Sequence, residues 1–269
     1  DMSKWMELSD RIARVKGEVS IAVVVKYGQG SDAYKSLKEA LYHAGLVNGI
    51  NVVIKWIDSE DLENKTPEEV ASYFDGVKGV LVPGGFGVRG TEGKIAAVRY
   101  ARENQIPYFG ICLGMQLAVI EFCRNVAGIC DAGSTEFEQP CTPIISLMTE
   151  WDMDGKTATR SKNSNKGGTL RLGRYPCELK EGSLARSIYG EELIYERHRH
   201  RYEMDIRFGE DLEKCGMEIS GKSPDGKLPE IIELTGHPFF IGVQFHPEFK
   251  SNPFKAHPIF VEFIKKAAL

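Results

Sequence analysis

One cysteine stands where a strand-like apolar run changes into a helix-like apolar run. In PYFGICLGMQLAVIEF, residues 107–122, Cys112 lies between Gly110 and Gly114. A nucleophile on a sharp strand-to-helix turn needs small neighbours, because its side chain must point out of a crowded and strained bend. The turn also brings the sulfur close to a helix N-terminus, which favours thiolate over thiol. The spacing therefore predicts a nucleophile, against the alternative of a small buried residue packed in a corner.

A thiol nucleophile needs a base, and one of the six histidines has a carboxylate beside it. In VQFHPEF, His246 and Glu248 are two positions apart, so in an extended segment both side chains project to the same side. The carboxylate would then hold the imidazole tautomer and stabilise its charged form. Taken alone, His246 is equally consistent with a structural histidine in a turn and with a general base. Taken together with the turn at Cys112, the general base is favoured. His43, His237 and His257 lack such a partner and are expected to be structural or surface residues.

The glycine-rich segment GGFGVRG, residues 84–90, follows a strand-like run and precedes a helix-like one. It contains GxGxxG, but it does not follow the first strand and no acidic residue lies about 20 positions on, so the pattern indicates a dinucleotide site only weakly. The favoured alternative is an oxyanion loop. In such a loop the N–H of Gly85 joins the N–H of Leu113, the residue after the proposed nucleophile.

The run ERHRHRYE, residues 196–203, contains three arginines and two histidines in eight positions. A solvated strand and a nucleic-acid patch are the simplest interpretations, and the glutamates at both ends argue against the second. In an extended strand Arg197, Arg199 and Arg201 share one face. A guanidinium on that face would suit a substrate carboxylate.

Composition limits the classes of partner. The 269 residues are 42% hydrophobic and 27% charged with a formal net charge of −4, which gives no overall electrostatic reason to bind nucleic acid or an anionic membrane. No apolar stretch approaches the roughly 18 residues that span a bilayer, and the charged start lacks a signal-peptide core, so we expect a cytoplasmic location. The six cysteines show neither a disulfide framework nor zinc spacing, and we expect free thiols and no metal site.

Strand-like and helix-like runs alternate in the first half of the chain. Strands are expected at 18–27, 50–57, 78–83 and 106–111. Helices are expected at 5–15, 66–77, 92–104 and 114–128, and within the segment 31–46, where the helix is expected to end before Gly45. Such alternation predicts right-handed crossovers and a mostly parallel sheet flanked by helices. From residue 140 onward, antiparallel pieces are expected at 145–161, 166–179 and 217–249, with a turn at 224–226 and a final helix at 257–269. The sequence predicts one α/β domain with a mixed sheet.

Two of these segments, GICLGMQ and QFHPE, together resemble the class I glutamine amidotransferases. The resemblance implies a flavodoxin-like α/β domain whose Cys-His-Glu triad releases ammonia from glutamine. The resemblance is narrower in four further segments, which are similar to the glutaminase domain of the CTP synthase family from residue 20 onward: VPGGFGVRG, GGTLRLG, RHRHRYE and HPEFKSNP. It implies that residues 1–18 form an inter-domain linker helix, that residues 19–269 form the glutaminase domain, and that the N-terminal amidoligase domain, which binds ATP and UTP, is absent from this chain.

The resemblance also assigns roles to residues. It implies Cys112 as nucleophile, His246 as general base, Glu248 as its orienting carboxylate, Gly85 and Leu113 as the oxyanion hole, Gly85, Leu113, Gly114, Met115 and Gln116 as lining of the L-glutamine site, Glu136 on the substrate ammonium and Arg201 on its carboxylate. It implies no metal or cofactor in this domain. For the full-length enzyme it implies ATP with Mg²⁺, GTP as an allosteric activator near the domain interface, and a homotetramer.

One segment departs from the family. The first strand usually continues with a sequence like GKYV, whereas this chain has VKYGQG at 25–30. Since no triad member lies there, the departure bears on the contact with the absent domain more than on hydrolysis.

The resulting hypothesis is hydrolysis of glutamine, whose ammonia the family uses to aminate ATP-activated UTP to CTP in pyrimidine nucleotide biosynthesis. One alternative is a glutaminase subunit of another synthetase, against which GGTLRLG and RHRHRYE argue. The other is a regulatory or assembly module whose hydrolase site is silent without its partner domain.

Overall fold

The structure is a computed structural model that describes residues 2–26, 32–137, 140–147, 150–153, 156–159 and 171–269. Most of the departure at 25–30 and the first part of GGTLRLG therefore lie outside the described residues. Within the described residues, no helix combines the length and the apolar character that a membrane crossing requires.

A nine-stranded mixed sheet forms the centre of the molecule, in the order β10-β9-β12-β13-β14-β4-β3-β1-β2. Its parallel part contains β1 (Glu18–Val25), β2 (Asn51–Asp58), β3 (Gly79–Val82), β4 (Tyr108–Ile111) and β14 (Phe240–Val243). Its antiparallel part contains β9 (Arg171–Leu179), β10 (Leu193–His200), β12 (Met217–Lys222) and β13 (Pro229–Leu234). The predicted mixed sheet, with its antiparallel strands in the C-terminal half, is confirmed.

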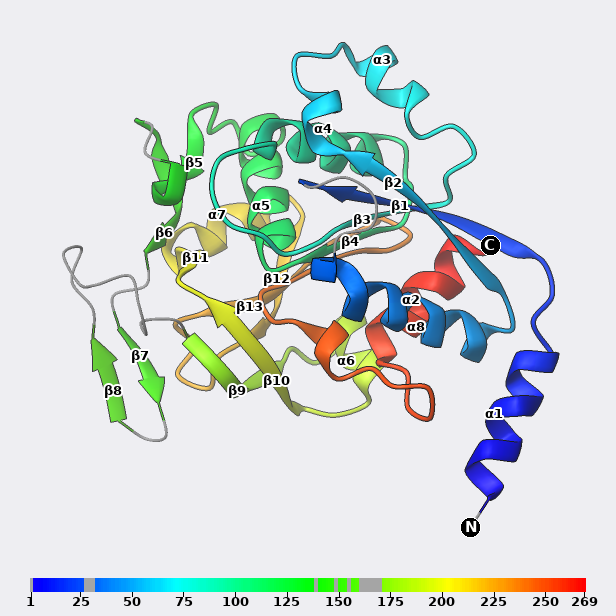
Figure 1. Cartoon of the computed structure of the whole chain (residues 1–269). Coiled ribbons are helices and arrows are strands. Elements are labelled where there is room, and N and C mark those ends of the chain that lie inside the picture. The colour runs from blue at the N-terminus through cyan, green and yellow to red at the C-terminus, as the bar shows by residue number, and fades with distance from the viewer. Residues whose placement is uncertain (1, 27–31, 138–139, 148–149, 154–155, 160–170) are drawn as a thin grey trace.

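Helices cover both faces of the sheet (Figure 1). One hydrophobic cluster involves α4 (Thr91–Glu103) and α5 (Leu113–Asn125), and a second involves α2 (Lys35–Asn48) and α8 (Pro258–Ala267). Strand β1 contributes Ala22 and Val24 to the first cluster and Ile21 and Val23 to the second. Because alternate side chains of a strand point to opposite faces, its continuous apolar run is the expected pattern for a strand buried on both sides.

Smaller elements complete the molecule. They are α3 (Pro67–Ser72), α6 (Leu184–Tyr189), α7 (Gly209–Lys214), the sheet of β11 (Tyr202–Met204), β6 (Thr142–Leu147) and β5 (Ala132–Ser134), the pair β7 (Glu150–Met153) and β8 (Lys156–Thr159), and the short 3₁₀ helices η1 (Asp32–Tyr34), η2 (Ser59–Leu62), η3 (Thr135–Phe137), η4 (Ile206–Phe208) and η5 (Pro247–Phe249). The short helices α6 and α7 were not predicted, since six-residue segments carry little periodicity.

The expected end of the second helix was wrong. Helix α2 continues through Gly45 and ends at Asn48, where Gly49 adopts a left-handed φ of 66°. Gly45 serves packing instead: a β-carbon placed on it would lie 2.7 Å from the carbonyl oxygen of Ile50. The glycine that stops the helix is therefore the later one, which is the usual C-cap arrangement.

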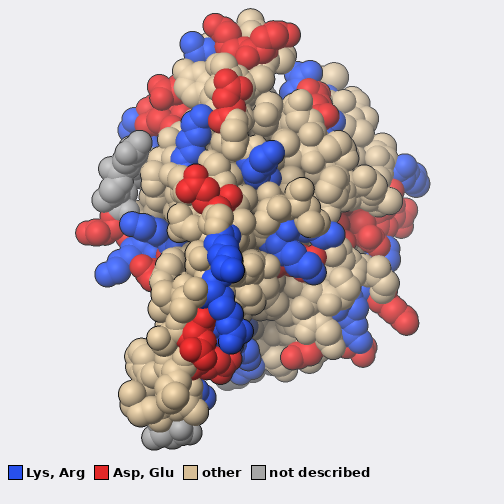
Figure 2. Space-filling model, turned by 90° about the vertical axis from the view of Figure 1, so that its right-hand side faces the viewer, with Lys and Arg blue, Asp and Glu red and all other residues tan. Residues whose placement is uncertain are grey.

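Helix α1 (Ser3–Ala13) has no buried residue and projects from the body (Figure 1). Its Trp5 ring meets the edge of Phe254 at a centroid distance of 4.9 Å. Basic and acidic side chains are interspersed on the face of the molecule that carries this helix (Figure 2). The helix lies within the range expected to be an inter-domain linker, and that assignment stays a prediction.

Candidate functional site

Cys112 occupies a strained corner between β4 and α5. It is the residue before the first turn of α5, and its φ of 53° lies in the left-handed region that non-glycine residues rarely adopt. A β-carbon on Gly110 would lie 2.8 Å from the carbonyl of Gly114, and one on Gly114 would lie 2.1 Å from the carbonyl oxygen of Val82. Glycines flank the cysteine because the backbone of the corner is packed against itself and against β3.

The hydrogen bonds of the corner fix the thiol at the start of α5. The Cys112 backbone N–H donates to the carbonyl oxygen of Val243 at 2.7 Å, and its own carbonyl accepts from Gln116 N–H at 3.2 Å. The side-chain amide of Gln244 donates to the sulfur at 3.7 Å. Such donors stabilise a thiolate more than a thiol, as does the helix N-terminus.

His246 and Glu248 form a pair at the C-terminal end of β14. Nδ1 of His246 lies 2.8 Å from Oε1 of Glu248, and the His246 backbone N–H donates to the carbonyl oxygen of Arg197 at 2.8 Å. Burial alone would lower the pKa of His246, but the charge and hydrogen bonding of Cys112 and Glu248 raise it to about 10. The imidazole is therefore held in its charged form at neutral pH.

Gly84 packs beside both Cys112 and the His246 imidazole. A β-carbon placed on it would lie 2.8 Å from Cε1 of His246 and 3.4 Å from Cβ of Cys112. The segments of β3, β4 and β14, distant in sequence, meet here because these strands are neighbours in the sheet. The sequence pattern predicted a role for Gly85 but not for Gly84, although both belong to the same glycine loop.

The thiol and the His-Glu pair open into a cavity of about 280 Å³. Its wall also includes Gly85, Phe86, Lys94 and Arg199. Charged side chains of both signs and the glycine loop in this wall give room and polarity for a small zwitterionic ligand.

The remaining predicted residues lie at different places around this cavity. A β-carbon on Gly85 would lie 3.4 Å from Cδ2 of Leu113. The two residues proposed as oxyanion donors are therefore neighbours in space. Glu136 in η3 reaches the glycine loop, where Oε1 accepts from Gly87 N–H at 2.8 Å. Arg201 lies between β10 and β11, and it is Arg199 that lines the cavity.

All four residues of the segment LGMQ are buried. The Gly114 carbonyl accepts from the Tyr108 hydroxyl at 2.9 Å, and Cβ of Met115 lies 3.0 Å from a β-carbon placed on Gly242. Gln116 donates to the Tyr202 carbonyl oxygen at 2.8 Å and to Oε1 of Gln244 at 3.1 Å. Gln116 thus supports the side chain that donates to the Cys112 sulfur.

The run ERHRHRYE contributes a buried polar cluster that the sequence did not predict. Strand β10 alternates, with Arg197 and Arg199 exposed and His198 and His200 buried. The two buried imidazoles lie 2.9 Å apart, from Nδ1 of His198 to Nε2 of His200, and burial lowers the pKa of His198 well below its usual value. The period-2 alternation predicted the shared face of the arginines, but not what the opposite face meets.

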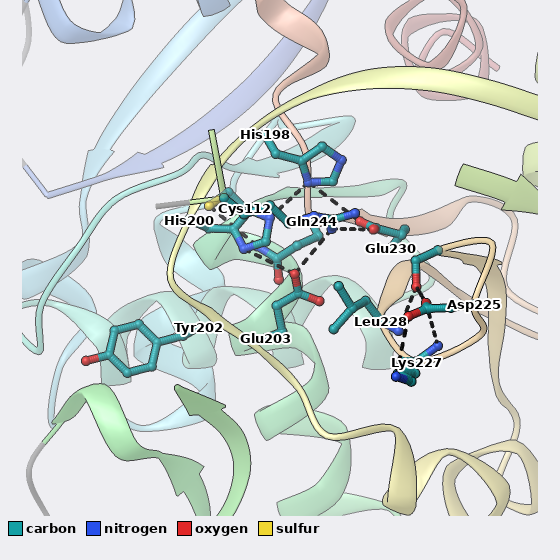
Figure 3. Close-up of polar contacts among 12 residues, drawn as sticks. Cys112, His198, His200, Tyr202, Glu203, Asp225, Lys227, Leu228, Glu230 and Gln244 are labelled. Carbon is teal, nitrogen blue, oxygen red and sulfur yellow. Dashed lines mark hydrogen bonds and ion pairs between the residues drawn. The ribbon is translucent and has the colours of Figure 1, made fainter. Parts of the chain in front are cut away.

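Two carboxylates and an arginine complete this cluster. Arg171 pairs with Glu203, at 3.3 Å from Nη1 to Oε1, and with Glu230. Burial raises the pKa of both carboxyls, that of Glu203 well above its usual value, while the Arg171 charge opposes the shift. Figure 3 shows Cys112 and Gln244 next to the histidines and carboxylates of the cluster.

The three other histidines have structural contacts. His43 lies 3.2 Å from Ser251 Oγ, and His237 lies 3.3 Å from the carbonyl oxygen of Ala101. The expectation that His43 and His257 lack a carboxylate partner was wrong. Nε2 of His43 lies 3.9 Å from Oε2 of Glu39. Nε2 of His257 lies 3.0 Å from Oε1 of Glu196. That pair joins residues 61 positions apart, so sequence spacing could not reveal it.

The six cysteines are free thiols. Among the described residues, no group of three or more histidine, cysteine or carboxylate side chains could hold a metal ion.

The close approach of Gly84 to the His246 ring allows a steric test. Alanine at position 84 places a methyl group against the imidazole, so we expect Gly84→Ala to lower kcat for glutamine hydrolysis by about 10²-fold while the protein stays folded. Gly85→Ala, whose β-carbon meets only ordinary contacts, is the control for folding alone, because Gly85 itself belongs to the proposed oxyanion hole. Steady-state kinetics measures kcat, thermal unfolding reports folding, and an unchanged kcat in folded Gly84→Ala would contradict the contact.

Comparisons with known proteins agree with this architecture. The model of the family "Glutamine amidotransferase class-I" matches residues 30–266. Two CTP synthases, from Rhodospirillum rubrum and Maricaulis maris, are 54% and 55% identical to the chain over 267 residues, or 99% of its length. The chain spans about half the length of these curated relatives. The glutaminase domain of Trypanosoma brucei CTPS with bound acivicin is 39% identical with a TM-score of 0.83, covering 93% of this chain and 94% of that one.

Proposed function

Because the chain belongs to the class I glutamine amidotransferase family, in the group formed by the glutaminase domains of CTP synthases, we propose that it hydrolyses L-glutamine to glutamate and ammonia. The proposal depends above all on the meeting of Cys112 with the His246–Glu248 pair, beside Gly84, in one cavity. Thiolate, general acid-base and orienting carboxylate are the three parts that acyl transfer from an amide needs.

In the first half of the reaction, the Cys112 thiolate attacks the side-chain amide carbon of glutamine. The carbonyl oxygen becomes an oxyanion that accepts hydrogen bonds from Gly85 and Leu113 N–H. Collapse of this intermediate breaks the C–N bond, and the His246 imidazolium donates the proton with which ammonia leaves. A glutamyl thioester on Cys112 and a neutral imidazole remain.

In the second half, His246 takes a proton from water, and the resulting hydroxide attacks the thioester carbon. The same two N–H groups hold the second oxyanion. The C–S bond then breaks, glutamate is released, and the Cys112 thiolate and the His246 imidazolium are restored. Glu248 holds Nδ1 throughout, so that Nε2 is the nitrogen that exchanges protons.

Substrate binding is assigned to the residues that the resemblance named. Glu136, anchored on the glycine loop by Gly87 N–H, would receive the substrate ammonium, and Arg201 its carboxylate. Gly85 and the residues of LGMQ would position the substrate side chain over the sulfur.

The longer protein that the relatives imply would use the ammonia. We propose that an N-terminal amidoligase domain binds UTP and ATP with Mg²⁺ and aminates UTP to CTP, with GTP acting near the domain interface. A homotetramer in the cytoplasm, without nucleic acid or membrane partners, belongs to the same proposal. Among the described residues of this chain, no group of histidine, cysteine or carboxylate side chains is arranged to hold a metal ion.

The raised pKa of His246 gives a spectroscopic prediction. Its imidazole should titrate near pH 10, and in Cys112→Ala the pKa should fall because the thiolate that raises it is gone. A raised pKa stabilises the fold fully below the unfolded value of about 6.5, and this stabilisation is lost as the pH rises through 10. NMR titration of the histidine ring protons measures the shift. A titration near pH 6.5 in both proteins would contradict the thiolate-imidazolium pair.

Glutamate release tests the proposed activity itself. The chain, alone or together with an amidoligase domain, should convert L-glutamine to equimolar glutamate and ammonia, and it should leave L-asparagine intact because the amide would not reach the sulfur. Release of ammonia from both amides at equal rates, or from neither in the presence of the amidoligase domain with ATP, UTP and GTP, would overturn the proposal.

A further inference from the structure

A buried lysine forms part of the wall of the proposed glutaminase site. Lys94 is the fourth residue of α4, its exposed fraction is 1%, and it lines the same cavity as Cys112 and His246. A lysine is almost never fully buried unless it is paired. Within the described part of the chain, Lys94 makes no ion pair with a carboxylate.

The position of its ammonium group is next to the glycine loop. Nζ of Lys94 lies 3.7 Å from a β-carbon placed on Gly85, and the same β-carbon lies 3.4 Å from Leu113. These two residues supply the N–H groups assigned above to the oxyanion. The Lys94 ammonium group therefore lies close to the proposed oxyanion hole, where negative charge develops during the reaction.

The charged groups around Lys94 come from four segments of the chain. Lys26 follows the end of β1, Asp58 ends β2, and Cys112 stands at the corner before α5, while His246 and Glu248 line the cavity with it. Burial and the neighbouring Lys26 lower the pKa of Lys94 to about 8, and the charges of Asp58 and Cys112 act in the opposite direction. The charge of Cys112 thus favours the charged form of Lys94.

Anchoring of α4 does not account for this placement. The start of α4 is already pressed against η2, since β-carbons on Gly90 and Gly93 would lie 2.1 Å from Ser59 Oγ and 1.7 Å from the Ser59 carbonyl oxygen. A positive charge near a helix N-terminus opposes the helix dipole, and its burial costs solvation energy. Buried ionisable groups with strongly shifted pKa values gather at functional sites.

We propose that Lys94 is a positioning residue of the glutaminase reaction, whose ammonium stabilises the Cys112 thiolate and then the oxyanion held by the glycine loop. The inference rests on the proposed function. Lys94 forms no bond and transfers no proton in this role. Its effect is electrostatic, through a fixed cation in a site of low dielectric constant.

Three variants separate this role from a structural one. Lys94→Met removes the charge at nearly the same length, Lys94→Arg keeps it, and Asp58→Asn removes the carboxylate that raises the lysine pKa. Glutamine hydrolysis should show kcat lowered about tenfold in Lys94→Met with KM within about twofold, and Lys94→Arg should recover part of the loss. The fall of kcat/KM above about pH 8 should vanish in Lys94→Met and move to lower pH in Asp58→Asn.

A second experiment measures the rate at which iodoacetamide alkylates Cys112 at pH 7, by intact mass. This rate should be lower in Lys94→Met than in the unchanged chain. An unchanged kcat with an unchanged alkaline limb in Lys94→Met, or an effect confined to KM, overturns the role of Lys94 while Cys112 still reacts. An unchanged chain whose Cys112 does not react at all overturns the proposed function, and this inference with it. If Lys94→Met fails to fold, Lys94→Arg and Asp58→Asn still decide through the alkaline limb.

Discussion

Replacement of Cys112 by alanine should reduce kcat for glutamine hydrolysis by about 10⁴-fold or more, because it removes the only protein atom that is proposed to bond to the substrate carbon. The oxyanion donors and the rest of the cavity stay in place, so glutamine binding should change much less than turnover. Thermal unfolding should be little altered, since the corner keeps the same backbone. Glutamate release under saturating glutamine is the measurement.

The matched control is Cys215→Ala. Cys215 is an exposed thiol at the end of α7, away from the cavity residues, and its loss should leave kcat unchanged. Activity in Cys112→Ala above about 1% of the unchanged chain would mean that another group is the nucleophile. Loss of activity in Cys215→Ala as well would point to a general effect of thiol loss on the fold.

Alanine at position 114 should destabilise the whole domain. Its β-carbon would lie 2.1 Å from the Val82 carbonyl oxygen, a distance that forces β3 and α5 apart. Overpacking of a well-packed interior costs about 1–3 kcal/mol and occasionally more. Because β3, the Cys112 corner and α5 move together, we expect about 3 kcal/mol less free energy of unfolding and a large loss of kcat.

Gly85→Ala serves as the control for this variant as well, because its nearest contact, at 3.4 Å, is an ordinary one. Chemical denaturation of both variants gives the free energies of unfolding. If Gly114→Ala were as stable as the unchanged chain, the close packing of α5 on β3 would be wrong.

The parts of the site that the sequence predicts are those encoded by short-range patterns. The corner at Cys112 is predicted directly by the two glycines at ±2 around it. The His246–Glu248 pair is predicted by their separation of two positions in the sequence. Alternation of strand-like and helix-like runs predicts the parallel sheet, because each crossover must return the chain to the same edge. Neighbouring strands then bring the residues at their carboxyl ends together, as observed for β3, β4 and β14.

What could not be predicted depends on contacts between distant segments. Lys94 sits in an ordinary amphipathic helical pattern, and only the packing of α4 against the glycine loop reveals its burial. The pairing of Arg171 with Glu203 and Glu230 joins three segments that have no shared motif. Gly45 shows the same limit, since the approach of Ile50 rather than local propensity explains a glycine inside α2.

Covalent labelling decides whether Cys112 is the nucleophile of a glutamine-specific site. The chain is incubated with an electrophilic glutamine analogue, and intact mass followed by peptide mapping locates the adduct. We expect one adduct per chain on Cys112, blocked by excess L-glutamine and absent from Cys112→Ala. Labelling of any other cysteine at the same rate, or no adduct in the chain joined to its amidoligase domain with ATP, UTP and GTP present, would contradict it.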